Sequence, residues 1–237
     1  MFLKNKIAIL TGASSGLGVA IAKALVKSDV LVYGLARNKV ALSNLQESLG
    51  YLFHPIEMDI TNREALLNWI QITFNEKHLP DILVNNAGIG NFGKVDEIPT
   101  EKWLEMVNTN LNGMYFITSL IVPFLKMNKQ VSHIINIGSI LATMGREDGT
   151  AYCATKYGVR GFSEALLKEL RPFDIKVTCV HPGSIETDFF KNSGIEKHSN
   201  MLQPDAIADT IIHILKTPDN MLIDEIIMRP LHAQKPL

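Results

Sequence analysis

The chain has 237 residues, of which 46% are hydrophobic and 20% charged, and its formal net charge at pH 7 is −1. This length and composition suffice to bury one α/β core, so we expect a single domain over residues 1–237. Lysine and arginine are spread along the chain, which argues against a nucleic-acid-binding protein.

Targeting and membrane signals are weak. The N-terminal segment lacks the small-residue cleavage site of a signal peptide, and the longest apolar stretch, 114–125, is short for a bilayer span and contains Pro123. Cys153 and Cys179 show neither metal-ligand spacing nor a disulfide framework. We therefore expect a cytoplasmic protein without a metal and without a membrane partner.

Apolar runs of strand length alternate with segments of helical periodicity. Parallel strands need crossovers, which helices supply, so the alternation predicts a Rossmann-type α/β fold: a doubly wound, mainly parallel sheet of seven strands with helices on both faces. The expected strands are 7–10, 30–35, 52–56, 82–84, 133–137, 177–180 and 223–228, and the expected helices include 20–26, 63–74, 101–125, 154–170 and 205–215.

A glycine-patterned turn, 11–18, joins the first strand to the first helix, where free backbone N–H groups and the helix dipole attract a pyrophosphate. Gly12 permits a tight turn, Gly16 a close backbone approach, and Gly18 close packing of helix on strand. The alternative is an ordinary glycine turn. A second glycine pattern at 88–93 follows the fourth strand without opening a helix, so we interpret it as a wall of the active cleft.

The end of the second strand indicates the cofactor. NAD sites place a carboxylate about 20 residues beyond the glycines, but the segment 34–38 contains none. Arg37 offers instead a planar fork that suits a 2′-phosphate. NADP (NADPH) is therefore favoured and NAD remains possible, because Ser15 stands where a second basic residue would strengthen the case and Arg37 could simply face solvent.

Tyr152 and Lys156 lie four residues apart, a spacing that puts both on one face of a helix. Alcohol oxidation needs a base at the carbinol oxygen, and carbonyl reduction needs an acid there. The ordinary pKa of tyrosine, about 10, is high for this task. An ammonium about 4 Å away, at a dielectric near 20, would stabilise the phenolate by roughly 4 kcal/mol, or about 3 pKa units. Alone, the pair could be an ordinary surface feature.

Over almost its whole length the chain resembles the short-chain dehydrogenase/reductase family, the type with TGxxxGxG and YxxxK motifs. The resemblance rests on the order and spacing of several motifs: the 11–18 turn, Asp59, Asn85-Asn86-Ala87-Gly88, Asn110, Ser139, Tyr152-x-x-x-Lys156 and Pro182-Gly183-x-x-x-Thr187. It implies an oxidoreductase that transfers a hydride between NADP(H) and a small or medium-sized alcohol or carbonyl substrate. Tyr152 would be the general acid–base.

The resemblance also assigns roles. Asn110, Ser139, Tyr152 and Lys156 would form a catalytic tetrad, with Ser139 on the substrate oxygen and Asn110 holding a water that links Lys156 to solvent. Asp59 and Ile60 would meet the adenine, and Thr187 with the backbone at Ile185 the nicotinamide carboxamide. The residues expected to bind the cofactor are Gly12, Ser14, Ser15, Gly16, Leu17, Gly18, Arg37, Asp59, Ile60, Asn86, Ala87, Gly88, Tyr152, Lys156, Pro182, Gly183, Ile185 and Thr187.

Several assignments stay open. Ser139 could merely turn the chain, and Asn110 could merely bond the backbone. His181 and Cys153 are interpreted as structural. Arg146 either anchors an acid-bearing substrate or is solvated.

The long irregular connection 188–203 is interpreted as a substrate lid. Its Phe189 and Phe190 either face Phe92 and Met144 across the cleft or belong to the core.

Assembly and function have alternatives too. The helices 101–125 and 154–170 carry apolar surface beyond what one sheet face needs, and the resemblance implies a homodimer or homotetramer. The competing functions are a non-catalytic NADPH-binding sensor and an NADP-dependent epimerase.

Overall fold

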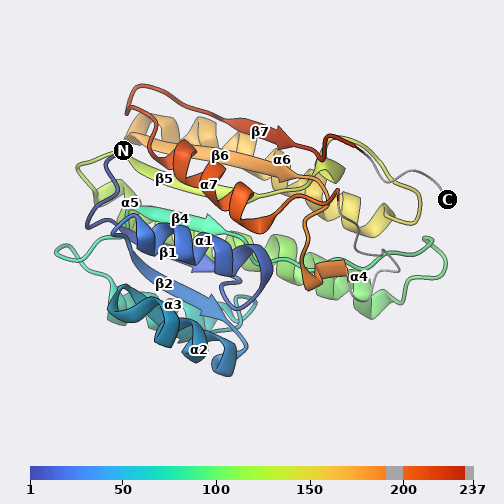
Figure 1. The fold of residues 1–237 in the computed structure, drawn as a ribbon, viewed down its shortest axis with the longest axis horizontal. Coiled ribbons are helices and arrows are strands. Elements are labelled where there is room, and N and C mark those ends of the chain that lie inside the picture. Colours follow the sequence, from blue (N-terminus) through green and yellow to red (C-terminus); the bar gives the residue numbers. More distant parts are fainter. Residues whose placement is uncertain (191–199, 233–237) are drawn as a thin grey trace.

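The computed structural model describes residues 1–190 and 200–232. Seven strands form one all-parallel sheet with the order β3-β2-β1-β4-β5-β6-β7 (Figure 1), which confirms the predicted fold class. The strands are β1 (Ile7–Thr11), β2 (Leu31–Ala36), β3 (Phe53–Glu57), β4 (Ile82–Asn85), β5 (Ser132–Ile137), β6 (Ile175–Pro182) and β7 (Glu225–Met228).

Helices cover both faces of the sheet. One apolar core lies between the sheet and α1, α2 and α7, and a second lies between the sheet and α3, α5 and α6. In Figure 1, α1 and α7 lie in front of the sheet and α5 and α6 behind it. The helices are α1 (Gly16–Lys27), α2 (Lys39–Leu49), α3 (Arg63–Thr73), α4 (Thr100–Val107), α5 (Met114–Met127), α6 (Thr150–Leu170) and α7 (Pro204–Leu215).

The strand order reverses at β1, which pairs with β2 on one side and β4 on the other. The crossovers that follow β1 and β4 therefore lie on opposite faces, and a crevice opens at the carboxyl ends of these strands. Every residue of β4, β5 and β6 is buried, as expected of central strands covered on both faces. The topology thus places a ligand site beside the glycine turn.

The structure adds α2, which the predicted elements do not include. Asn38 caps its first turn by accepting a hydrogen bond from the Ala41 N–H (3.0 Å), and Gly50 ends the helix at a φ of 74°. Helix α6 begins at Thr150, four residues before the predicted start, so Tyr152 lies inside its first turn.

The single helix predicted over 101–125 is wrong in its middle. The described helix is α4, then a π-helical segment Asn108–Gly113, then α5. Two contacts account for the wider turn: the Asn110 side chain accepts a bond from the Ile89 N–H (2.8 Å), and Gly113 lies so close to Ile60 that a Cβ there would be 2.7 Å away. π-Helical turns often mark functional sites, because they redirect a side chain.

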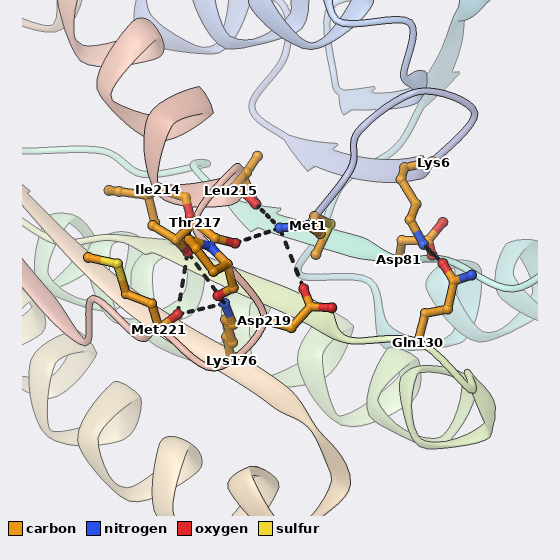
Figure 2. Close-up of polar contacts among 11 residues, drawn as sticks. Met1, Lys6, Asp81, Gln130, Lys176, Ile214, Leu215, Thr217, Asp219 and Met221 are labelled. Carbon is orange, nitrogen blue, oxygen red and sulfur yellow. Dashed lines mark hydrogen bonds and ion pairs between the residues drawn. The ribbon is translucent and has the colours of Figure 1, made fainter.

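Two lysines with little exposed surface, Lys6 and Lys176, make polar contacts at the end of the sheet where the strands begin (Figure 2). Lys6 Nζ lies 2.7 Å from Asp81 Oδ1 and also donates to Gln130 Oε1. Asp81 Oδ2 accepts a further bond from the Ile7 N–H (2.9 Å), which fixes β1 beside β4. Because the Lys6–Asp81 pair is nearly buried, loss of one partner would leave an uncompensated charge.

The second lysine, Lys176 on β6, holds the turn after α7. Its Nζ donates to the carbonyl oxygens of Pro218 and Met221 (2.6 Å each) and lies 3.3 Å from Thr217 Oγ1. The amine of Met1 donates to the Thr217 carbonyl oxygen (2.7 Å). These bonds anchor the connection from α7 to β7 at the end of the sheet where the strands begin, away from the crevice at their carboxyl ends.

In the described part of the chain, no helix is both long enough and apolar enough to span a bilayer.

Candidate active site

A cleft of about 1200 Å³ lies at the carboxyl ends of the strands. It runs from the glycine turn to Tyr152 and Lys156, and all 18 residues expected to bind the cofactor line it. Sites for drug-sized ligands measure roughly 300–1,000 Å³, so this cleft has room for a dinucleotide together with a small second molecule. Of the predicted catalytic residues, Ser139, Tyr152 and Lys156 line it and Asn110 lies behind its wall.

The glycine turn is built as a cradle. Gly12 and Gly16 have positive φ values of 68° and 50°, and a Cβ on Gly18 would lie 2.0 Å from the Gly12 carbonyl oxygen. Helix α1 begins at Gly16 with no acidic residue in its first turn. Its first residues, Gly16, Leu17 and Gly18, line the cleft. The N–H groups of a first helical turn have no partner within the helix and lie at the positive end of its dipole, so these residues fit a pyrophosphate.

Asn86 supports this turn from below. Its Nδ2 donates to the carbonyl oxygens of Thr11 (3.0 Å) and Gly12 (3.1 Å), while Thr11 Oγ1 accepts bonds from the Asn86 and Ala87 N–H groups (3.0 Å each). Thr187 packs on Gly16 from the other side: a Cβ there would lie 3.1 Å from Thr187 Cγ2. The side-chain amide of Asn86 thus shapes the cradle.

The opposite end of the cleft carries Arg37 and Asp59. Arg37 is exposed at the end of β2 and lines the cleft. Asp59 Oδ1 accepts bonds from the Thr61 N–H (2.9 Å) and hydroxyl (2.8 Å), which fixes the loop, and Ile60 is buried against Gly113. A cation and an apolar surface therefore lie side by side at this end.

Tyr152 and Lys156 are both buried in the cleft floor, each 6% exposed. Lys156 Nζ donates to the Ile137 carbonyl oxygen (3.0 Å) and lies 5.7 Å from the centroid of the Tyr152 ring. Burial raises the pKa of the Tyr152 phenol above its ordinary value, and a side-chain hydrogen bond with Ser139 opposes this. Burial lowers the pKa of Lys156 to about 8.

Ser139 lies two residues after the end of β5 and caps a short 3₁₀ turn, Ile140–Ala142. Its Oγ accepts a bond from the Leu141 N–H (3.1 Å), so the hydroxyl proton stays free to be donated elsewhere. The serine turns the chain, as the simpler interpretation expects, and it also lies beside the tyrosine.

Asn110 is 2% exposed and joins two walls of the cleft. Its Nδ2 donates to the Ile89 carbonyl oxygen (2.9 Å) and to Thr155 Oγ1 (3.0 Å), and Thr155 Oγ1 donates to the Tyr152 carbonyl oxygen (2.8 Å). The side chain therefore connects the loop after β4 to Thr155 of α6 and, through the Thr155 hydroxyl, to the Tyr152 main chain. The water relay through Asn110 stays a prediction.

Aromatic side chains line the end of the cleft beyond Tyr152. The ring centroids of Phe92 and Phe189 lie 5.2 and 6.0 Å from that of Tyr152, and Arg146 Cζ lies 5.0 Å from the Phe92 centroid. Phe189 packs against Gly90, where a Cβ would lie 2.8 Å from its ring. The pattern 88–93 is therefore a wall, as predicted, and Phe189 faces the cleft.

The predicted lid lies largely outside the described residues, which exclude 191–199. Leu202, near its end, is joined to the segment that precedes the connection: the Leu202 N–H donates to the Ser184 carbonyl oxygen (2.8 Å), and the Glu186 N–H donates to the Leu202 carbonyl oxygen (2.9 Å). Met144 lines the cleft as well.

Sequence reasoning missed a second group of lining residues. Their position next to Ser139 is a usable signal for those in the turn after β5, whereas the α4 residues join the cleft only through the fold. They include Ile140 and Leu141 from that turn, and Glu101, Lys102 and Glu105 from α4.

Other candidate groups lie outside the cleft lining. Cys153 is buried in an apolar cluster with Met106 and Leu141, and His181 is fully buried. Among residues 1–190 and 200–232, His, Cys, Asp and Glu side chains form no group of three that could hold a metal ion.

Comparison with known proteins gives consistent matches. The model of the family described as short chain dehydrogenase matches residues 6–198. The chain is 36% identical to the 3-oxoacyl-(acyl-carrier-protein) reductase FabG of Vibrio harveyi, over 81% of this chain and 78% of that protein.

Two solved structures are similar over nearly the whole chain. The closed form of a serine dehydrogenase complexed with NADP+ has a TM-score of 0.88 and 26% identity, covering 98% of both chains. A 3-ketoacyl-(acyl-carrier-protein) reductase from Brucella melitensis complexed with NADH has a TM-score of 0.89 and 27% identity, covering 97% of this chain and 98% of that one.

Proposed function

Because the chain belongs to the short-chain dehydrogenase family, we propose that it is an NADP(H)-dependent oxidoreductase acting on a small or medium-sized alcohol or carbonyl substrate. One observation carries the proposal: Tyr152, Ser139 and Lys156 meet on the floor of a cleft whose far wall is a pyrophosphate cradle. When bound, the nicotinamide would accept or supply the hydride.

The proposed chemistry of the protein itself is proton transfer and orientation. In reduction, the Tyr152 phenol donates its proton to the oxygen of the substrate carbonyl as negative charge develops there, and the Ser139 hydroxyl donates a hydrogen bond to the same oxygen. In oxidation, the phenolate takes the proton back. Since burial raises the pKa of Tyr152, the phenol is protonated at neutral pH, which is the form that reduction needs.

Lys156 eases formation of the phenolate. At the 5.7 Å that separates its Nζ from the ring centroid, a dielectric near 20 gives about 3 kcal/mol, or about 2 pKa units. The bond from Lys156 Nζ to the Ile137 carbonyl oxygen (3.0 Å) holds the ammonium beside the ring. The lysine therefore offsets part of the burial that raises the pKa of the phenol.

NADP(H) is the cofactor that we propose, since Arg37 supplies a guanidinium at the end of β2 and no carboxylate occupies 34–38. The turn 11–18 would hold the pyrophosphate, Asp59 and Ile60 the adenine, and Ile185 and Thr187 the carboxamide. The similar structures contain NADP+ in one case and NADH in the other, so the discrimination depends on this chain's own residues.

Arg37→Ala tests this choice. Loss of a charge-assisted bond to phosphate should weaken NADPH binding by about 10- to 100-fold (about 1.5–3 kcal/mol) and leave NADH binding nearly unchanged. Fluorescence titration of both nucleotides measures the two Kd values. Lys39→Ala, which removes a neighbouring exposed cation, is the control. An equal loss for both nucleotides in Arg37→Ala would contradict the assignment.

Tyr152→Phe tests the catalytic proposal. It removes only the hydroxyl, so we expect kcat to fall by at least about 10²-fold while the Kd for NADPH is kept. NADPH consumption with a panel of ketones and aldehydes gives the rate. Tyr157→Phe, on the same helix but exposed, is the matched control.

The same panel separates the alternatives. Tight NADPH binding without turnover of any carbonyl would favour the sensor, and isomerised product without net NADPH consumption would favour the epimerase. Cytoplasmic location and assembly into a homodimer or homotetramer stay predictions, as do the lid over 188–203 and the absence of a metal.

A further inference from the structure

His181, at the end of β6, lies against the main chain that carries Ser139. The ring is fully buried, and its Nδ1 lies 2.9 Å from the Ser139 carbonyl oxygen and 3.3 Å from the Ser139 nitrogen. The approach is so close that a Cβ on Gly138 would lie 2.5 Å from Nδ1. The imidazole therefore packs directly on the backbone that leads into the site.

The other side of the ring faces a charged pair. His181 Nε2 lies 3.0 Å from Glu225 Oε1 on β7. No aligned hydrogen bond joins these two atoms. The carboxylate beside Nε2 favours the neutral tautomer that carries its proton there. Arg160 on α6 holds the same carboxylate with two contacts, Nε to Oε1 (2.9 Å) and Nη2 to Oε2 (3.1 Å), which fix the Glu225 side chain beside the ring.

The parallel register produces this arrangement. Glu225 pairs with Cys179, and side chains two residues apart on a strand share a face, so Glu225 and His181 lie on the same side of the sheet. Arg160 of α6 contacts Glu225 on that side. Arg160 is one helical turn beyond Lys156. Lys156 itself donates to the Ile137 carbonyl oxygen (3.0 Å), two residues before Ser139. Side chains from α6 and β6 thus hold both ends of the segment 137–139.

The imidazole keeps a bond to Ser139 in either neutral tautomer. With the proton on Nδ1, it donates to the Ser139 carbonyl oxygen; with the proton on Nε2, beside Glu225, the Nδ1 lone pair accepts from the Ser139 N–H. The charged groups that face the ring are Glu225, Arg160 and Lys156. Burial lowers the pKa of His181, with smaller help from the two cations, although the Ser139 backbone bond and Glu225 oppose the shift; the ring is therefore neutral at pH 7.

We propose that His181, oriented by Glu225 and Arg160, is a positioning residue that holds the Ser139 main chain so that its hydroxyl faces the Tyr152 phenol. The inference rests on the proposed function. A well-packed apolar residue would stabilise a core as well as these buried polar contacts do. The contacts from Arg160 through Glu225 and His181 in addition fix the orientation of the Ser139 main chain.

Three variants and a control test this. His181→Leu removes both ring nitrogens at similar size, and His181→Asn keeps a donor and an acceptor near the Nδ1 position. Glu225→Gln keeps shape and removes charge, and Asp224→Asn removes an exposed charge from the neighbouring position. We expect kcat to fall by about 10²-fold in His181→Leu and about tenfold in Glu225→Gln, with the Kd for NADPH unchanged and most of the rate restored in His181→Asn.

Amide hydrogen exchange gives a readout that needs no turnover. The Ser139 N–H, which faces His181 Nδ1, should exchange faster in His181→Leu, while the Gly138 N–H, bonded to the Val180 carbonyl oxygen (2.7 Å), stays protected. A folded His181→Leu with wild-type kcat, or with unchanged Ser139 exchange, would overturn the proposal. So would equal losses in His181→Asn and His181→Leu.

Ser139→Ala separates the two levels of inference. If it keeps the wild-type rate, or if wild-type protein reduces no carbonyl, the proposed function fails and the positioning role falls with it. If Ser139→Ala is impaired and His181→Leu is not, the positioning role alone is wrong.

Discussion

Lys156 is a buried ammonium whose presence costs folding free energy, so its removal should stabilise the protein. Burial lowers the pKa of this group from 10.5 to about 8. At about 1.36 kcal/mol per pKa unit, the charged form is disfavoured by about 3 kcal/mol. Methionine has a similar length and no charge, but its substitution also removes the bond to the Ile137 carbonyl oxygen (3.0 Å), which is worth about 1–2 kcal/mol.

The net expectation for Lys156→Met, without cofactor, is a gain of about 1–2 kcal/mol at pH 7, or roughly 2–8 °C in Tm. Because the folded-state pKa lies below the unfolded one, the cost is fully present below pH 8 and is relieved as the pH rises from about 8 to 10.5. The gain should therefore shrink to about zero near pH 9.5. Turnover should be lost at every pH.

Urea unfolding of wild-type and variant protein at pH 7.0 and 9.5 measures the difference. Lys168→Met, on the exposed face of the same helix, is the control and should change stability by less than about 0.5 kcal/mol at either pH. A Lys156→Met protein that is less stable than wild type at pH 7, or a difference that does not change with pH, would refute the reasoning.

Two further substitutions test the cradle and the π-helical turn. Gly18→Ala places a Cβ 2.0 Å from the Gly12 carbonyl oxygen; it should destabilise the protein by about 1–3 kcal/mol and abolish nucleotide binding in titrations, whereas Gly161→Ala, with open space around it, should be neutral or stabilising. Asn110→Ala leaves partners of the amide unsatisfied, so we expect a loss of about 1–3 kcal/mol in urea unfolding and a slower hydride step. Asn112→Ala, on the exposed side of the same turn, should change neither the stability nor the hydride step. Wild-type stability and rate in Asn110→Ala would remove that residue from the site.

The amino-acid sequence by itself determined the features that depend on local chemistry. The glycine spacing in 11–18 specifies a turn with positive φ values at Gly12 and Gly16, because other residues rarely adopt them. The alternation of apolar runs with helical periods determined the parallel sheet. The four-residue spacing of Tyr152 and Lys156 placed both side chains on one helix face, and Arg37 was identified by its position after β2.

Only the tertiary structure decided how distant segments share partners. At the π-helical turn, the Asn110 amide bonds Ile89 and Thr155 at the same time, and no local pattern encodes that pairing. Lys156 Nζ finds its acceptor at the end of β5, the Ile137 carbonyl oxygen, 19 residues away in the chain. Likewise His181 meets Glu225 only through the pairing of β6 with β7. Hydrogen bonds and burial depend on distances in space, and residues far apart in the chain acquire those distances only when the sheet and helices pack.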